Sequence, residues 1–176
     1  MPKRKQIDVF SHLLNIGWSV IFFTPLLMYW MEVGIDKWLS VLIMLSIVTA
    51  FVPRQILHKL RIYKNKKSYE KWRLKTFRKF VQEGDHSWAT KTRTRSISNP
   101  LKAKQYLGKI DMYERFHWCC LIFFLLSSLH CFLHDRGTYG ILITVANVVF
   151  NIPTILLQQY NRLRIEGLMK RQKEHV

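Results

Sequence analysis

Asn-Ile-Pro-Thr-Ile-Leu-Leu-Gln-Gln-Tyr-Asn-Arg-Leu-Arg, residues 151–164, is the segment from which the architecture of this chain can be worked out. It is an apolar run that contains Asn151 and Pro153 and becomes polar from Gln158 onward. This pattern is typical of a membrane helix that leaves the bilayer through a cationic end. Amide side chains at membrane depth are costly unless they find partners or line a cavity. The segment therefore predicts a membrane span and marks its polar residues as functional candidates.

The charge of the chain separates two classes of basic protein. The net charge is +17, but hydrophobic residues make up 49% of the 176 residues. A soluble nucleic-acid binder seldom combines such a charge with so much apolar sequence, so the position of the charge is informative. Of the 28 Lys and Arg residues, 18 lie between Arg54 and Arg115. The basic residues therefore lie between the apolar runs and not within them.

Four apolar runs that are almost free of charge predict membrane helices. A helix needs about 20 residues to cross the hydrocarbon core. The second run is short for a span and is expected to start at the interface on Trp38. The sequence thus predicts an all-α, polytopic membrane protein in which residues 1–176 form a single membrane domain. The four predicted spans are residues 13–30, 38–53, 116–133 and 139–160.

The basic segments set the expected topology. Because segments rich in Lys and Arg stay on the cytoplasmic side, we expect both ends of the chain to be cytoplasmic. The loop 54–115 and the tail 161–176 are then cytoplasmic as well, and four spans agree with this arrangement. Basic and aromatic residues alternate between His58 and Val81, which predicts interfacial helices on anionic membrane lipids. Residues 82–101 are expected to form a loop, and residues 102–115 a helix that leads into the third span.

Two polar clusters are expected at the same cytoplasmic depth. Glu114 and His117 are three residues apart, so they share a helical face on which the carboxylate can orient the imidazole. A histidine at this depth can remove a proton from an alcohol, and an arginine can hold an anionic group. The first cluster, where the third span begins, is Glu114, His117 and Trp118. The second, where the fourth span ends, is Gln158, Tyr160, Asn161, Arg162 and Arg164.

A simpler interpretation of the same residues stays open. His117 and Trp118 are also the residue types of an interfacial belt, and terminal arginines obey the positive-inside rule without any catalytic role. His130 and His134 have the spacing of a metal pair, but no third ligand is evident nearby, so no metal site is predicted. The basic run 91–95 is expected to meet lipid headgroups and not nucleic acid.

The polar residues of the fourth span carry a resemblance to a known family. The pattern Asn151-x-Pro153-x4-Gln158-x-Tyr160-Asn161-Arg162-x-Arg164 resembles the closing signature of the bacterial glycosyl-4,4'-diaponeurosporenoate acyltransferases. Glu114-x-x-His117-Trp118 is similar to the second block of that family. This chain has Met112 and Lys109 where the family usually has an arginine and a glutamate.

The resemblance implies a membrane enzyme of the bacterial cell membrane that esterifies a sugar hydroxyl of a glycosylated carotenoid or related glycolipid with a fatty acyl chain. The acyl donor, such as acyl-CoA or acyl-carrier protein, is a co-substrate, and no other cofactor is expected. His117 is expected to be the general base and Glu114 its orienter. The expected substrate-binding residues are Trp118, Asn151, Gln158, Tyr160, Asn161, Arg162 and Arg164.

Other classes of function are compatible with the same sequence. A non-catalytic membrane scaffold or lipid-binding protein would act through the basic loop and would tolerate loss of His117 or Glu114. A small transporter is disfavoured, because the charged residues lie at span ends and not in mid-bilayer. The expected partners are membrane lipids, the glycolipid substrate and the acyl donor, and oligomerisation is compatible with the small interior of four spans.

Overall fold

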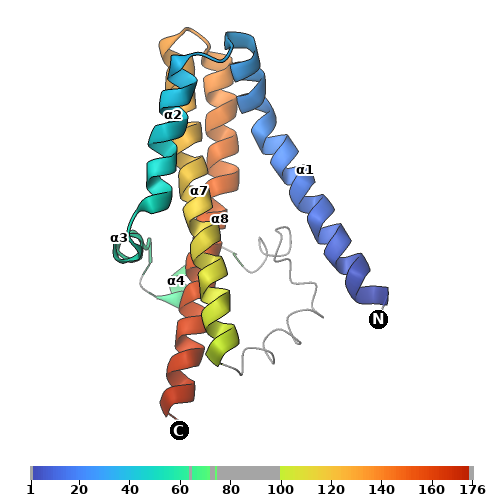
Figure 1. Cartoon of the computed structure of the whole chain (residues 1–176), viewed down its shortest axis with the longest axis vertical. Helices are drawn as coiled ribbons and strands as arrows, with labels where there is room; N and C mark the ends of the chain where they lie inside the picture. Colours follow the sequence, from blue (N-terminus) through green and yellow to red (C-terminus); the bar gives the residue numbers. More distant parts are fainter. Residues whose placement is uncertain (1, 64, 72–73, 75–99, 175–176) are drawn as a thin grey trace. The chain divides into compact units, whose positions relative to one another are not determined.

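The chain is helical in every element of its computed structural model, which describes residues 2–63, 65–71, 74 and 100–174 (Figure 1). No strand occurs among these residues, so the predicted all-helical class is confirmed. The helices are α1 (Pro2–Val33), α2 (Lys37–Val48), η1 (Thr49–Phe51), α3 (Arg54–Lys59), α4 (Lys66–Lys71), α7 (Pro100–Leu133) and α8 (Gly137–Glu174).

Three helices are long and apolar enough to cross a membrane. The candidate spans are Ile16–Val33 in α1, Ala103–Leu133 in α7 and Gly137–Arg171 in α8. They correspond to three of the runs predicted from the sequence and are typical of a membrane protein. The remaining run forms a shorter apolar helix, Lys37–Phe51. Its role as a fourth span stays a prediction.

Both long C-terminal helices extend beyond the spans predicted for them. α7 joins the predicted cytoplasmic helix to the third span without a break, and α8 continues through the predicted tail to Glu174. Apolar side chains explain the extension of α8, because Ile165 is buried and Met169 packs beside it against the start of α7. A helix that keeps an apolar face in contact with a neighbour has no reason to end at the membrane surface.

The described chain divides into two compact units. Unit 1 comprises Met1–Ile16, Arg61–Glu114 and Leu156–Val176. Unit 2 comprises Gly17–Leu60 and Arg115–Ile155. α1, α7 and α8 each contribute to both units.

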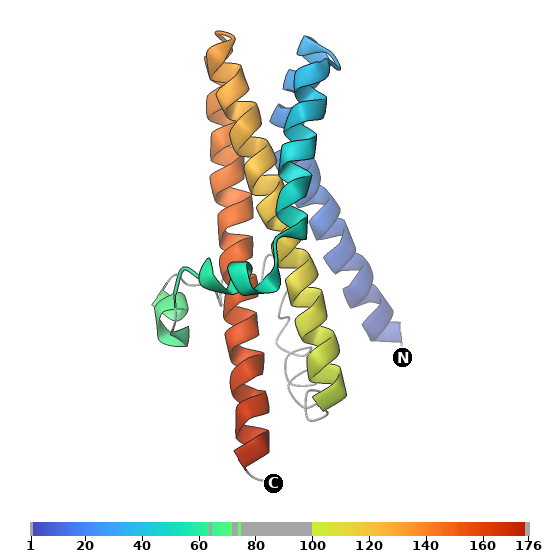
Figure 2. The same cartoon turned by 60° about the vertical axis from the view of Figure 1, so that its left-hand side comes forward.

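The long helices of unit 2 form two helical hairpins, α1 with α2 and α7 with α8, packed through one apolar core (Figure 2). α7 and α8 approach closely near their turn, because a Cβ atom at Gly140 would lie 2.8 Å from the ring of Phe132. The core residues are Leu26, Tyr29, Trp30, Leu42, Phe124, Cys131, Ile143 and Ala146.

The turns of the two hairpins contact each other. Gly34 (φ 91°) and Asp135 (φ 57°) adopt the left-handed conformation that ends α1 and α7. Arg136 makes an ion pair of 2.7 Å with Glu32, and the Tyr139 hydroxyl donates to the same carboxylate at 2.8 Å. Both turns therefore lie at the same end of unit 2, as the predicted hairpin topology requires.

The outer surface of unit 2 is apolar, as expected of a surface in contact with lipid. A soluble monomer seldom exposes large apolar side chains over several helices at once. Here they occur on α1, α2, α7 and α8 and include Ile21, Met44, Val48, Leu129 and Val145. At the opposite end from the turns, the Arg115 guanidinium donates to the carbonyls of Ala50 and Val52, each at 2.6 Å, and so holds the end of η1 against α7.

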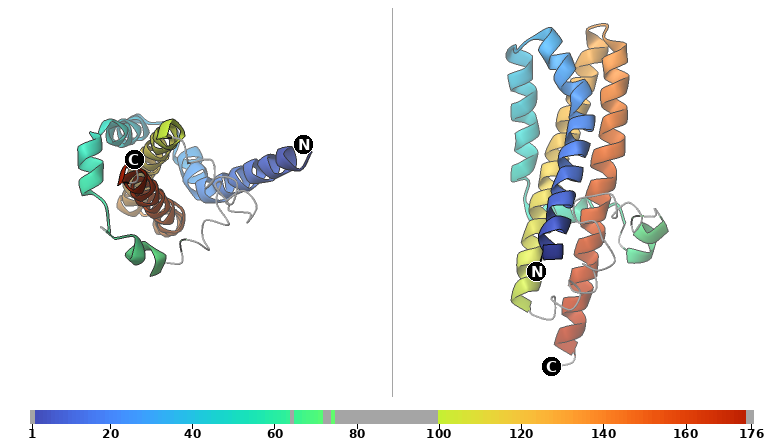
Figure 3. Two further views of the ribbon diagram at one scale, coloured as in Figure 1. Left: turned by 90° about the horizontal axis from the view of Figure 1, so that it is seen from below. Right: turned by 90° about the vertical axis from the view of Figure 1, so that its right-hand side faces the viewer.

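In unit 1 the first part of α7 and the last part of α8 run antiparallel and side by side (Figure 3). Their contact is made by Ala103 and Ile110 of α7 with Ile165 of α8. The six-residue helix α4 lies within the region 58–81 where interfacial helices were predicted, whereas α3, a part of unit 2, overlaps that region only at its last two residues. Residues 64, 72–73 and 75–81 of that region and residues 82–99 of the predicted loop 82–101 lie outside the described residues.

Candidate functional site

A polar stripe follows one face of α8 through the apolar sequence. Its members are separated by three or four residues, which places them above one another on a helix. All are buried, so each needs a partner inside the protein. The stripe consists of Asn147, Asn151, Thr154, Gln158 and Asn161.

In unit 2 the stripe meets the histidine of α7. His117 Nδ1 lies 3.1 Å from Asn151 Oδ1. The Asn151 amide donates to Asn147 Oδ1 at 2.9 Å, and the Asn147 amide donates to the Leu121 carbonyl at 3.0 Å. We call these three side chains the amide chain. The amide chain carries no formal charge unless the His117 ring takes up a second proton.

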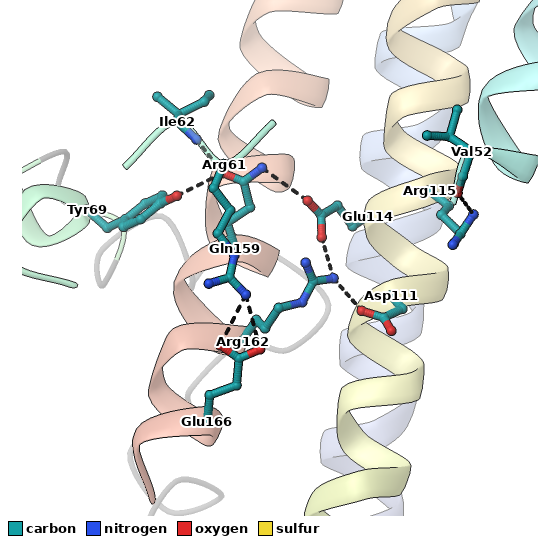
Figure 4. A network of polar contacts seen from close by, with 10 residues as sticks. All are labelled: Val52, Arg61, Ile62, Tyr69, Asp111, Glu114, Arg115, Gln159, Arg162 and Glu166. Carbon is teal, nitrogen blue, oxygen red and sulfur yellow. Dashed lines mark hydrogen bonds and ion pairs between the residues drawn. The ribbon is translucent and has the colours of Figure 1, made fainter. Parts of the chain in front are cut away.

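In unit 1 the two helices are joined by buried charges (Figure 4). Arg162 of α8 is fully buried, and its Nη2 atom makes an ion pair of 2.5 Å with Glu114 Oε2 of α7. The same nitrogen contacts Asp111, one turn earlier on α7. Two carboxylates therefore share one guanidinium, and the pair with Glu114 is entirely withdrawn from solvent.

Gln159 extends this network to the segment between α3 and α4. Its Nε2 donates to Glu114 Oε1 at 3.1 Å. Its Oε1 accepts from the Tyr69 hydroxyl at 2.8 Å and from the Ile62 backbone at 3.2 Å (Figure 4). Nearby, Nη2 of Arg61 donates to both carboxylate oxygens of Glu166, each at 3.1 Å. We call the side chains joined in this way the charged network: Arg61, Tyr69, Asp111, Glu114, Gln159, Arg162 and Glu166.

Burial fixes the protonation of the phenol in the charged network. Removal from solvent raises the pKa of Tyr69 above its ordinary value of 10.0, although the hydrogen bond from the Tyr63 backbone and the charge of Arg61 act in the opposite direction. Tyr69 is therefore a neutral donor at physiological pH. A neutral phenol suits its place, because its hydroxyl donates to Gln159 and accepts from Tyr63 at the same time.

Several buried polar atoms have no hydrogen-bond partner among the described residues. They include Nε and Nη1 of Arg162, Oε1 of Gln158 and Nε1 of Trp118. Uncompensated buried donors and acceptors are uncommon in native proteins, and they often mark places where a ligand or water supplies the partner. Arg162 thus keeps donor capacity beyond its two carboxylates.

The structure distributes the predicted site residues over several contacts. Glu114 contacts Arg162 and Gln159, whereas the hydrogen bond of the His117 ring goes to Asn151. The orienting role predicted for Glu114 stays a prediction. Of the remaining predicted residues, Gln158, Tyr160 and Asn161 are buried, and Trp118 and Arg164 are half-buried. The Tyr160 hydroxyl donates to Glu70 at 3.4 Å.

Sequence reasoning missed the residues that complete both sets of contacts. Asn147 lies four residues before Asn151 and Asp111 three before Glu114, so helical spacing was a usable signal for these two. The spacing signal fails for Arg61, Tyr69 and Gln159. Their partners are distant in sequence, and only the packing of the segment 61–71 against α8 brings them together.

A second polar cluster lies near the hairpin turns of unit 2. The buried Tyr29 hydroxyl lies 2.6 Å from His130 Nδ1, and Trp30 donates to Ser127 at 3.1 Å. The rings of His130 and His134 stack with centroids 4.0 Å apart. Within the described ranges, no group of three or more His, Cys, Asp or Glu residues is placed to hold a metal ion.

The fold and these contacts define a helical membrane protein with a buried histidine and a buried charged network on its last two long helices. The family model for glycosyl-4,4'-diaponeurosporenoate acyltransferase matches residues 53–171, and the chain belongs to this family. The resemblance seen in the sequence is thereby confirmed, and the family supports an acyltransferase of carotenoid biosynthesis. No curated protein matches the chain, and no solved structure does.

Proposed function

We propose that this protein transfers a fatty acyl chain to a sugar hydroxyl of a glycosylated carotenoid or a related glycolipid, with His117 as the general base. The observation that carries the proposal is the buried His117 ring, held by Asn151, inside the part of the chain that matches the acyltransferase family. A general base must be fixed within reach of the proton that it removes, and a ring held by an oriented amide meets that requirement.

The proposed reaction needs a base and an activated acyl donor. His117 takes the proton of the sugar hydroxyl while the hydroxyl oxygen attacks the carbonyl carbon of an acyl thioester. The thioester is either acyl-CoA or an acyl chain on acyl-carrier protein. The tetrahedral intermediate then expels the thiolate, which receives the proton back from the imidazolium. The ester forms, the thioester breaks, and no metal or redox cofactor takes part.

The donors left on Arg162 support a contact with an oxygen-rich part of a substrate. Two of its nitrogens, Nε and Nη1, lack acceptors among the described residues, although its charge is matched by Asp111 and Glu114. A guanidinium whose charge is already matched is suited to hydrogen-bond a neutral sugar or carbonyl oxygen. A neutral, oxygen-rich group of a substrate is therefore a better candidate ligand for Arg162 than a free anion. Trp118, Gln158, Tyr160, Asn161 and Arg164 remain the further proposed contacts.

For the topology we propose four spans in the bacterial cell membrane, with both ends of the chain cytoplasmic. The shared end of the two hairpin turns supports this arrangement, since two adjacent hairpins with basic flanks place their turns on the other side of the bilayer. The short apolar helix Lys37–Phe51 would then be the fourth span. The proposed partners are membrane lipids, the glycolipid acceptor and the acyl donor.

The test is mass spectrometry of lipid extracts from cells with the wild-type protein, with no protein, and with His117→Ala at matched membrane abundance. We expect the acylated glycolipid to fall at least about 100-fold with His117→Ala, the usual effect of removing a general base. The unacylated precursor should accumulate in the same cells.

His134→Ala is the matched control, because His134 is an exposed histidine in the turn that follows α7. It should keep the wild-type lipid profile. Identical profiles in all strains would refute the enzyme proposal and leave the scaffold as the function to pursue. A product lost only in the strain without protein would keep the enzyme and remove His117 as its base.

A further inference from the structure

The two amides in the amide chain of unit 2 can point only one way, and the residue that decides this is Leu121. The chain ends on the Leu121 backbone carbonyl, which can only accept a hydrogen bond. Asn147 must therefore turn its NH₂ group toward Leu121. The orientation of the Asn147 amide is thus fixed by the Leu121 carbonyl, which cannot donate.

This orientation passes along the chain to the histidine. With its NH₂ group used on Leu121, Asn147 presents Oδ1 to Asn151, which accepts the Asn151 NH₂ group at 2.9 Å. Asn151 then has only Oδ1 left for His117, 3.1 Å from the ring nitrogen Nδ1. An amide oxygen accepts and cannot donate, so the hydrogen of this contact belongs to Nδ1.

A neutral imidazole carries one proton, so protonation of Nδ1 leaves Nε2 with a free lone pair. The same contact survives when the ring takes up a second proton, because Nδ1 keeps its hydrogen in the imidazolium. The ring can therefore accept and return a proton at Nε2 while its bond to Asn151 stays intact. This is the property required of a base that is reused in each cycle.

Burial makes the alternative arrangement expensive. Asn151 is fully buried, and Asn147 and His117 are 7% and 8% exposed. A flipped amide would bring two oxygens or two NH₂ groups face to face where water cannot compensate. The three hydrogen bonds of the amide chain are therefore all satisfied in a single arrangement of the two amides.

We propose that Asn151 and Asn147 are positioning residues that hold His117 in the Nδ1–H tautomer and so present Nε2 to the hydroxyl of the acceptor. This inference rests on the proposed function only for the role of Nε2. The tautomer itself is a property of the resting protein. It can be measured whether or not the protein is an acyltransferase.

The experiment combines nitrogen NMR with activity. Protein labelled with ¹⁵N-histidine is placed in lipid nanodiscs at a pH where the ring is neutral, and the signals of His117 are identified by their loss in His117→Gln. Nδ1 and Nε2 have different shifts in the two tautomers. We expect the Nδ1–H pattern in the wild-type protein and in Asn151→Asp, whose neutral carboxylic acid keeps an acceptor opposite Nδ1 and a donor toward Asn147 Oδ1.

Asn151→Leu removes the acceptor without a large change in volume. We expect it to release the ring toward the Nε2–H tautomer and to lower acyl transfer at least about tenfold, with kcat and not KM affected. Asn147→Leu should do the same more weakly, because the Asn151 amide is then free to flip. Asn151→Asp should recover most of the activity lost in Asn151→Leu.

Thr154→Val is the matched control, since Thr154 is buried on the same face of α8 but donates only to the Phe150 carbonyl of its own helix. It should leave both the tautomer and the activity unchanged. An Nε2–H pattern in the wild-type protein would overturn the inference. So would an unchanged pattern and activity in Asn151→Leu while His117→Ala is inactive, and in that case the proposed function would stand.

An active His117→Ala variant would instead contradict the proposed function and leave the tautomer untouched. It would refute His117 as the base, and the Nδ1–H pattern would then show a structural use of the amide chain. The two failures are therefore distinguishable.

Discussion

The charged network of unit 1 and the amide chain of unit 2 bury polar side chains in opposite ways. The network sets the cations Arg61 and Arg162 against three carboxylates, and each ion pair joins segments distant in sequence. The amide chain is neutral and uses two asparagines and one carbonyl to hold one ring. Paired charges satisfy one another and stabilise an arrangement, whereas the neutral chain leaves one ring nitrogen available. The contrast assigns structure mainly to the first and chemistry mainly to the second.

The largest effect should come from removing the cation of the charged network. Arg162→Met leaves Glu114 and Asp111 without their shared partner, and Glu114 is fully buried. Breaking a buried pair in this way typically lowers the free energy of unfolding by about 3–5 kcal/mol. Denaturant unfolding in detergent, followed by tryptophan fluorescence, measures the change. Arg164→Met is the control, and an equal loss in both variants would show that the buried pairing is not the cause.

A smaller effect is expected from Glu114→Gln. The variant keeps an acceptor for Gln159 but loses the charge that faces Arg162, so we expect a loss of about 1–3 kcal/mol in unfolding free energy. Acyl transfer per folded molecule should stay within about threefold of wild type, less than 1 kcal/mol in the barrier. A tenfold or larger fall at unchanged fold would instead establish the orienting role that the sequence predicts for Glu114.

Tyr69→Phe tests the neutral part of the charged network. Loss of the hydroxyl removes the donor to Gln159 and should cost about 1 kcal/mol at pH 7. Burial raises the folded-state pKa of Tyr69 above 10.0, so its contribution is present below pH 10 and is lost as pH rises through the raised value. The difference in stability between wild type and Tyr69→Phe should therefore be constant below pH 10 and narrow as the pH rises above 10. A difference that stays constant above pH 10 would contradict the assignment.

The smallest effect should come from the exposed ion pair at the hairpin turns. The side chains of Arg136 and Glu32 are 51% and 41% exposed, so solvent screens their attraction. We expect Arg136→Gln to lower the unfolding free energy by less than about 1 kcal/mol. Added salt should weaken the wild-type pair to a similar extent. A loss as large as that of Arg162→Met would remove the distinction between buried and exposed pairs.

Most of the helical architecture could be predicted from sequence, because long apolar runs separated by basic segments leave few other solutions in a membrane. The end of the third span at Leu133 and the turn that follows were predicted in this way. The continuation of α8 to Glu174 was not. It depends on Ile165 and Met169 finding α7, a tertiary contact that local hydropathy does not report.

The site was predictable to the same depth. Motif residues such as His117, Asn151 and Arg162 were recognised from type and spacing, and all three are buried. The partner of His117 was not recognised, because a carboxylate three residues away on the same helix is the expected orienter. The contact of His117 with Asn151 depends on how α7 packs against α8, and residue spacing along one helix carries no information about that packing.

The amide chain also has a consequence for the lipid around the protein. It crosses between α7 and α8 twice, since His117 and Leu121 are four residues apart on one helix and Asn147 and Asn151 are four apart on the other. Sliding one helix by a single residue, about 1.5 Å, would stretch both crossings together. Helices tilt and shift when the hydrocarbon thickness differs from their apolar length. We therefore expect acyl transfer, measured in bilayers of increasing acyl-chain length, to fall off on both sides of one preferred thickness.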